Sequence, residues 1–124
     1  MKFNEDRPIF EQIARLLEDR ILAGALVESG RLPSARELAA TLEVNPNTAA
    51  RALQYLADLG LSYAERGSGY FVSPGAADTI RTLRRDRFFS EELPTLFAIM
   101  TSLGIPIDEV VSAWDHYVQR KDGV

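Results

Sequence analysis

The sequence predicts a mostly α-helical fold, with three helices and a β-hairpin in residues 1–75 and a short helical tail in residues 76–124. Three observations lead to this fold class. Apolar residues recur at helical spacing through most of the chain, two helix-start signals follow each other closely, and a glycine-tipped hairpin pattern comes next.

The first predicted helix begins at Pro8, because proline suits a first helical turn, and ends before Gly24. Its apolar residues repeat with the helical period and predict one buried face: Ile9, Phe10, Ile13, Leu16, Leu17 and Ile21.

Two short helices are predicted to follow in close succession. Ser34 and Glu37 form an S-x-x-E capping box, in which each side chain satisfies a free backbone amide, so a helix of about two turns begins there. Asn45 can cap the next helix, and Pro46 suits its first position because a proline nitrogen needs no acceptor. Gly60 is expected to close that helix.

A β-hairpin is predicted after these helices. Leu61–Glu65 and Tyr70–Val72 flank Arg66-Gly67-Ser68-Gly69, where glycine permits the positive φ of a tight turn. Two closely connected helices, the second with a polar start, followed by such a hairpin are typical of a winged helix-turn-helix. Ser73-Pro74-Gly75 marks its end.

The tail is predicted to contain a basic segment, Asp78–Phe89, and then a helical hairpin whose turn is Gly104-Ile105-Pro106. The apolar faces of that hairpin could form a private core, but they are rich for two helices. We therefore expect a second copy to cover them. The predicted dimerisation residues are Leu93, Leu96, Phe97, Met100, Leu103, Val110, Val111, Trp114 and Tyr117.

The basic segment has two interpretations. Its arginines (Arg81, Arg84, Arg85 and Arg87) could add phosphate contacts, but we favour a solvated helix face that pairs with Asp86, Glu91 and Glu92. The single histidine, His116, has no nearby ligand partners in sequence, which favours a surface or interface position over a metal site.

Composition excludes several classes of function. The chain has no cysteine, which excludes disulfides and thiolate chemistry, and no phosphate loop or defensible carboxylate pair. We expect no enzymatic activity, no cofactor and no metal. No apolar run approaches the roughly 20 residues that span a bilayer, and no signal peptide is recognised, so a cytoplasmic protein is expected.

The net charge of -4 argues against nucleic acid, because phosphate binding needs a basic footprint. A DNA reader needs only one locally basic face, however. From Arg31 to Gly75 the acidic excess disappears: Arg31, Arg36, Arg51 and Arg66 stand against Glu37, Glu43, Asp58 and Glu65.

Short or flexible hydrogen-bonding side chains at the start of the third helix fit the edges of bases in the major groove. The second helix start suits a phosphate, and the hairpin glycines allow close approach to the duplex. The candidate DNA-binding residues are Ser34, Arg36, Asn45, Pro46, Asn47, Thr48, Arg51, Arg66, Gly67, Ser68 and Gly69. Taken singly, Ser34 and Asn45 have the commoner role of helix caps, and Gly67 and Gly69 could equally be turn residues. Arg36 and Arg51 could be surface arginines in weak salt bridges.

The stretch from Pro8 to Val72 resembles the winged helix-turn-helix of the GntR family. The matching motifs are P-I-F-x-Q-I at Pro8–Ile13, L-P-S-x-R-x-L-A at Leu32–Ala39, V-N-P-N-T at Val44–Thr48 and R-G-S-G-Y-F-V at Arg66–Val72. The V-N-P-N-T version and the short tail are most similar to the YtrA-like subfamily.

The resemblance implies a homodimer that binds a palindromic operator in double-stranded DNA, usually as a repressor and often near transporter genes. It implies a DNA contact by Arg36, with Asn45 to Thr48 at the tip of the recognition helix and Gly67 at the tip of the wing. Ala50 departs from the family pattern, because several branches carry arginine there. That contact is either missing or supplied by Arg51. The remaining residues are too few for a large effector domain, so no small-molecule site is expected. The alternative is a winged helix that docks proteins and does not bind DNA.

Overall fold

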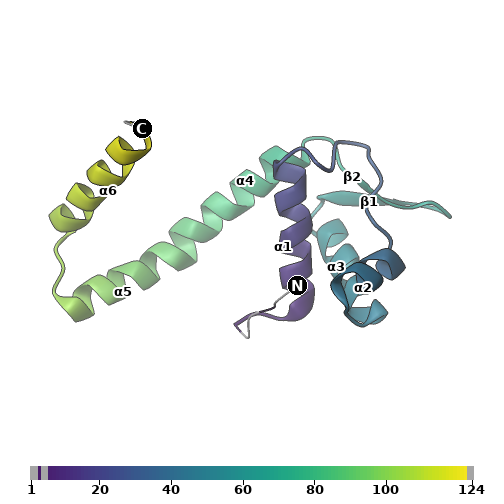
Figure 1. Cartoon of the computed structure of the whole chain (residues 1–124), viewed down its shortest axis with the longest axis horizontal. Coiled ribbons are helices and arrows are strands. Elements are labelled where there is room, and N and C mark those ends of the chain that lie inside the picture. The colour runs from purple at the N-terminus through teal and green to yellow at the C-terminus, as the bar shows by residue number, and fades with distance from the viewer. Residues whose placement is uncertain (1–2, 4–5, 123–124) are drawn as a thin grey trace. The chain divides into compact units, whose positions relative to one another are not determined.

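The computed structural model describes residue 3 and residues 6–122, and the chain divides after Leu83 into two compact units. The first unit contains α1 (Ile9–Leu22), α2 (Ala35–Leu42), α3 (Pro46–Asp58), β1 (Ser62–Glu65) and β2 (Gly69–Val72). Figure 1 shows these three helices with the two-stranded hairpin that follows them. The mostly helical winged fold predicted from the sequence is confirmed.

Both predicted helix starts are present as capping interactions. Ser34 Oγ accepts a hydrogen bond from the Glu37 amide at 3.1 Å, and the Ser34 amide donates to the Glu37 carboxylate at 3.3 Å. Asn45 Oδ1 accepts from the Asn47 amide at 2.8 Å, with Pro46 in the first turn. Because these signals are local, the starts of α2 and α3 coincide with the predicted residues.

The core of the first unit lies between the three helices and the base of the hairpin. Both α1 and α2 pack against α3. The start of the next helix, α4 (Ala76–Arg87), also contributes, since Ala76 and Ile80 are buried in the same cluster. The first unit therefore extends eight residues beyond the position 75 chosen from Ser73-Pro74-Gly75. Its buried residues include Ile13, Leu17, Leu32, Leu38, Leu53, Leu56, Leu61 and Val72.

The hairpin is antiparallel, with Ser62 opposite Val72 and Glu65 opposite Gly69. Its turn is closed by the Ser68 amide, which donates to the Glu65 carbonyl at 3.0 Å. Gly67 and Gly69 have φ angles of 79° and 98°, which residues with a side chain rarely adopt. The prediction of a glycine-dependent turn is confirmed.

The helical chain continues from α4 through a π-helical turn, η1 (Phe88–Glu92), into α5 (Leu93–Leu103). Pro94 lies in the first turn of α5, where it has no N–H to donate and its ring excludes the carbonyl of Ser90. A wider π turn just before it accommodates both constraints. The sequence analysis did not predict this turn.

The last helix, α6 (Ile107–Asp122), follows Gly104, which closes α5 with a φ of 67°. Ala76–Leu103 and Ile107–Lys121 are bent by 118°, short of the reversal in a closed helical hairpin. Of residues 84–121, Met100 is the one buried residue, so this part of the chain forms no private core. Within the described residues, no single helix is long and apolar enough to span a membrane. Ala76–Leu103 and Ile107–Lys121 reach the required length and apolar composition only when they are counted together.

Candidate nucleic-acid interface

The first turn of α3 presents polar side chains on its outer side. Asn45, Pro46 and Asn47 are exposed and Thr48 is half-buried, whereas Ala49 points into the core. The Asn45 side chain is used in the cap, but within residues 6–122 the side chains of Asn47 and Thr48 have no hydrogen-bond partner. These two side chains are therefore available to a ligand.

The start of α2 contributes a cation. Arg36 is exposed and has no ion-pair partner in the described part of the chain. The Ser34 hydroxyl is already engaged, because it accepts the Glu37 amide in the capping box. Ser34 thus shapes this helix start, and Arg36 is the group free to meet an anion.

The four residues at the tip of the hairpin, Arg66, Gly67, Ser68 and Gly69, are all exposed. The Ser68 carbonyl accepts a hydrogen bond from Arg31 Nε at 3.1 Å. Arg31 was not among the candidate residues, because nothing in the local sequence indicates a partner so far along the chain.

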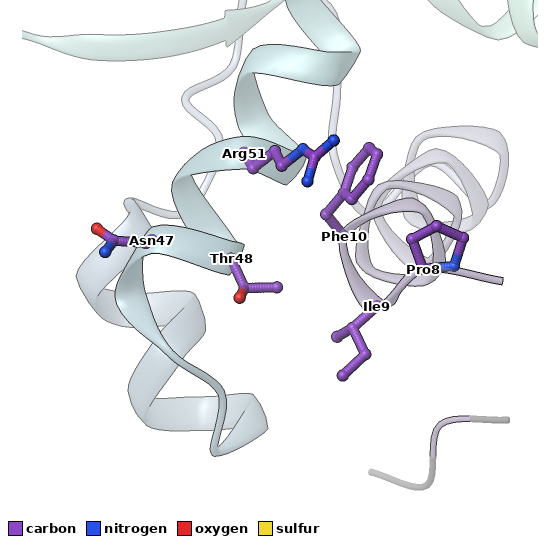
Figure 2. Close-up of a pocket in the computed structure, with 6 residues that line it drawn as sticks. All are labelled: Pro8, Ile9, Phe10, Asn47, Thr48 and Arg51. Carbon is purple, nitrogen blue, oxygen red and sulfur yellow. The ribbon is translucent and has the colours of Figure 1, made fainter. Parts of the chain in front are cut away.

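Arg51 lies on the side of α3 that faces α1. Its guanidinium carbon is 4.0 Å from the centroid of the Phe10 ring, a cation–π contact, and Phe10 in turn meets Tyr55 edge-to-face at 5.5 Å. Figure 2 shows Arg51 beside Phe10, together with Pro8, Ile9, Asn47 and Thr48. These six residues line a pocket of about 350 Å³.

Ala50 lies on another side of α3. It lines a groove of about 200 Å³ together with Arg31, Ser34 and Tyr70 from the hairpin side, a set that does not include Arg51. Arg51 is thus held toward α1 and does not fill the space beside Ala50. Of the two alternatives for the contact made by the family arginine, this geometry favours the one in which that contact is missing.

Glu37 has a pKa below its ordinary value of 4.5. The largest cause is the hydrogen bond from the Ser34 backbone amide, followed by the Ser34 hydroxyl and Arg31, whose Nη1 is 3.4 Å from Glu37 Oε1. Since the charged form is favoured in the folded state, this carboxylate stabilises the fold above pH 4.5, and the contribution is lost as the pH falls through its lowered pKa.

Glu37→Gln should therefore be less stable than wild type at neutral pH, with a difference that shrinks toward zero as the pH falls through the lowered pKa. Glutamine retains a side-chain oxygen for the cap but not the charge. Urea denaturation at a series of pH values measures this. Glu65→Gln, which alters an exposed carboxylate without a side-chain partner in the described residues, is the control. A difference that is independent of pH would contradict the prediction.

Most predicted dimerisation residues on α5 and α6 are exposed. Leu96, Phe97, Leu103, Val111, Trp114 and Tyr117 are exposed, Leu93 and Val110 are half-buried, and Met100 is buried. Trp114 is 62% exposed, with its ring 6.0 Å from that of Tyr117. Four further exposed large apolar residues of the described tail were not among the predicted dimerisation residues: Phe88, Phe89, Ile99 and Ile107. Phe88 and Phe89 lie in the π turn η1. Pro94 was the one feature of the sequence that could have indicated a distorted helix there.

The basic segment makes contacts within its own helix. Arg81 pairs with Asp78 at 3.1 Å, where the sequence analysis expected Asp86, Glu91 and Glu92, and the Arg85 guanidinium lies 5.0 Å over the Phe89 ring. The exposed His116 has its Nδ1 3.0 Å from the Ser112 carbonyl.

Comparison with known proteins decides the family. The sequence profile of "Bacterial regulatory proteins, gntR family" matches residues 9–72, from α1 to β2. The chain belongs to the GntR family. GntR proteins are DNA-binding transcriptional regulators, so this chain is a regulator with a helix-turn-helix domain and not an enzyme.

Two curated relatives come from Bacillus subtilis (strain 168). The uncharacterized HTH-type transcriptional regulator YhcF is 32% identical over 110 residues, which cover 89% of each chain. The HTH-type transcriptional repressor YtrA is 37% identical over 73 residues, which cover 59% of this chain and 56% of YtrA. The predicted similarity to YtrA-like GntR regulators is thereby confirmed.

Two solved structures extend the comparison. A putative GntR regulator from Bacteroides thetaiotaomicron is 38% identical, with a TM-score of 0.79 over 92% of this chain and 99% of that one. The DNA-binding domain of AraR, solved in complex with operator ORR3, is 25% identical with a TM-score of 0.53 over 59% of this chain and 88% of that domain. The first likeness includes the tail, and the second covers little beyond the winged domain.

Proposed function

We propose that this GntR regulator represses transcription as a homodimer that binds a palindromic operator in double-stranded DNA. The observation that carries the proposal is the first turn of α3, where Asn47 and Thr48 present side chains without a hydrogen-bond partner in the described residues. Such groups at the start of a recognition helix reach base edges in the major groove. The repressor YtrA and the operator-bound AraR domain support this assignment.

The other exposed groups of the same unit have roles in this proposal. Arg36 and Arg66 neutralise backbone phosphates from α2 and from the wing, and Gly67 allows the wing to approach closely. Because Arg51 stacks on Phe10 at the α1 side of α3, it is suited to a phosphate at the edge of the groove rather than to a base.

The homodimer rests on the exposed apolar side chains of α5 and α6. Large apolar residues such as Phe97 and Trp114 remain 47% and 62% exposed in one chain, an arrangement that favours burial against a second copy. A two-fold dimer then presents two recognition helices to half-sites about 34–36 Å apart. From the YtrA-like resemblance, we propose transporter genes as targets and the cytoplasm as the site of action.

A gel-shift titration with the upstream region of the protein's own operon, at several salt concentrations, tests the proposal. Specific binding should weaken steeply with salt, with a slope of about -0.9 per neutralised phosphate, because counterions are released. Shuffled DNA of the same length is the control. Binding that is absent, or that does not respond to salt, would favour the alternative of a protein-docking winged helix.

A further inference from the structure

Arg31 lies in a short segment that runs along the hairpin just before α2. The Leu32 amide donates to the Tyr70 carbonyl at 2.9 Å, and the Ser29 amide donates to the Val72 carbonyl at 2.8 Å. Arg31 itself forms an antiparallel bridge with Phe71. The backbone of this segment is therefore fixed against β2, which directs the Arg31 side chain along the hairpin.

The Arg31 side chain joins two elements that are far apart in sequence. Its Nε donates to the Ser68 carbonyl at 3.1 Å, and its Nη1 is 3.4 Å from Glu37 Oε1, the oxygen that also accepts the Ser34 amide. A Cβ atom added to Gly69 would lie 3.7 Å from Arg31 Nε, so the guanidinium is directly against the backbone of the turn. One side chain thus connects the wing turn to the first turn of α2.

We propose that Arg31 is a positioning residue that fixes the wing turn relative to α2, so that Arg66 and Arg36 meet the DNA backbone together. The inference rests on the proposed function, because it assumes that the wing contacts DNA. Another side-chain tether of the hairpin lies nearer its base, where the Tyr70 hydroxyl donates to Gln54 Oε1 at 3.0 Å. Without Arg31, the described part of the chain would hold the turn by the Ser68–Glu65 hydrogen bond and the pairing of Glu65 with Gly69, both within the hairpin itself.

Folding stability does not explain the Arg31 contacts. The side chains of Arg31 and Glu37 are 51% and 58% exposed, and an ion pair this accessible contributes little to the free energy of unfolding. The contacts instead restrict a glycine-containing turn whose two-stranded hairpin would otherwise move freely at its tip. Such restriction lowers the entropy lost when the wing binds DNA.

The inference has a test that does not need DNA. In the free protein, Arg31→Ala should accelerate hydrogen exchange at the Ser68 and Gly69 amides, while the α3 amides and the thermal midpoint stay close to wild type. Arg81→Ala, which breaks a comparably exposed ion pair on α4, is the matched control and should leave the wing amides unchanged. Unchanged exchange at Ser68 and Gly69 in Arg31→Ala would overturn the inference, whatever happens with DNA.

A double-mutant cycle on the operator separates positioning from direct contact. Arg31→Ala should weaken binding about tenfold, Arg31→Lys less, and Arg31→Ala should cause no further loss in an Arg66→Ala background, because its effect passes through the wing. Fully additive losses would show that Arg31 contacts DNA itself, and wild-type affinity in Arg31→Ala would exclude both roles. If the wild-type protein fails to bind, the proposed function fails, and the exchange result still decides the positioning role.

Discussion

Replacement of Thr48 or Arg36 by alanine, each alone, should abolish operator binding in a gel shift at protein concentrations where the wild type is saturated. Thr48 lies at the start of α3, and Arg36 is an exposed cation without an ion-pair partner in the described residues. A lost contact to a base or phosphate costs about 1–3 kcal/mol, and a symmetric dimer loses it at both half-sites. The combined loss of about 2–6 kcal/mol corresponds to an affinity lower by a factor of roughly 30 to more than 10,000.

Matched substitutions on α4 serve as controls for these two variants. Thr79→Ala removes a hydroxyl that donates to the Gly75 carbonyl within the same helix start, and Arg81→Ala removes a cation that pairs with Asp78. Both should bind the operator like wild type. Circular dichroism and light scattering should show an unchanged fold and oligomeric state in all four proteins. Wild-type affinity in Thr48→Ala or Arg36→Ala would mean that the DNA face lies elsewhere.

Local signals explain why the helix starts could be predicted from the sequence. A capping box needs only Ser34 and Glu37, three residues apart, and the α3 start needs only Asn45 and Pro46. The winged fold follows from these signals and from apolar periodicity. The position at which the first unit ends could not be predicted from these signals. Ala76 and Ile80 belong to its core but follow Pro74-Gly75, a pair that usually marks the end of regular structure.

Contacts between residues that are distant in the sequence could not be predicted from the sequence. Arg31 and Ser68 are 37 positions apart, and no local pattern pairs them. The same holds for Arg51, whose stacking on Phe10 depends on how α1 packs against α3. Candidate residues could therefore be named by type and position, whereas the direction in which each side chain points depended on tertiary packing.

The separation of Ala50 from Arg51 shows why this direction matters for function. Adjacent residues on a helix point about 100° apart, so Arg51 cannot replace a side chain at position 50 without leaving its contact with Phe10. Arg31 lines the same groove as Ala50, and its guanidinium is held there by Glu37 and the Ser68 carbonyl. The positions of the charged groups at the interface thus depend on tertiary packing as well as on the order of residues in the sequence.

Trp114→Asp should convert the proposed dimer to a monomer when the mass is measured by light scattering. Trp114 is 62% exposed in one chain and lies against Tyr117, which makes it the largest apolar surface that α6 offers to a partner. Replacing the indole by a carboxylate would remove an interface contact of about 2 kcal/mol or more and would bury an unpaired charge. In a two-fold dimer both effects occur in each subunit.

Gln119→Asp, an acidic substitution at an exposed position of the same helix, is the control and should remain dimeric. The Trp114→Asp monomer should keep its winged domain folded, because none of residues 107–121 belongs to that core. It should bind the operator far more weakly, since one recognition helix would then be held without the other. A Trp114→Asp protein that stays dimeric would place the interface away from this face of α6, whereas a monomer with wild-type affinity would separate dimerisation from DNA recognition.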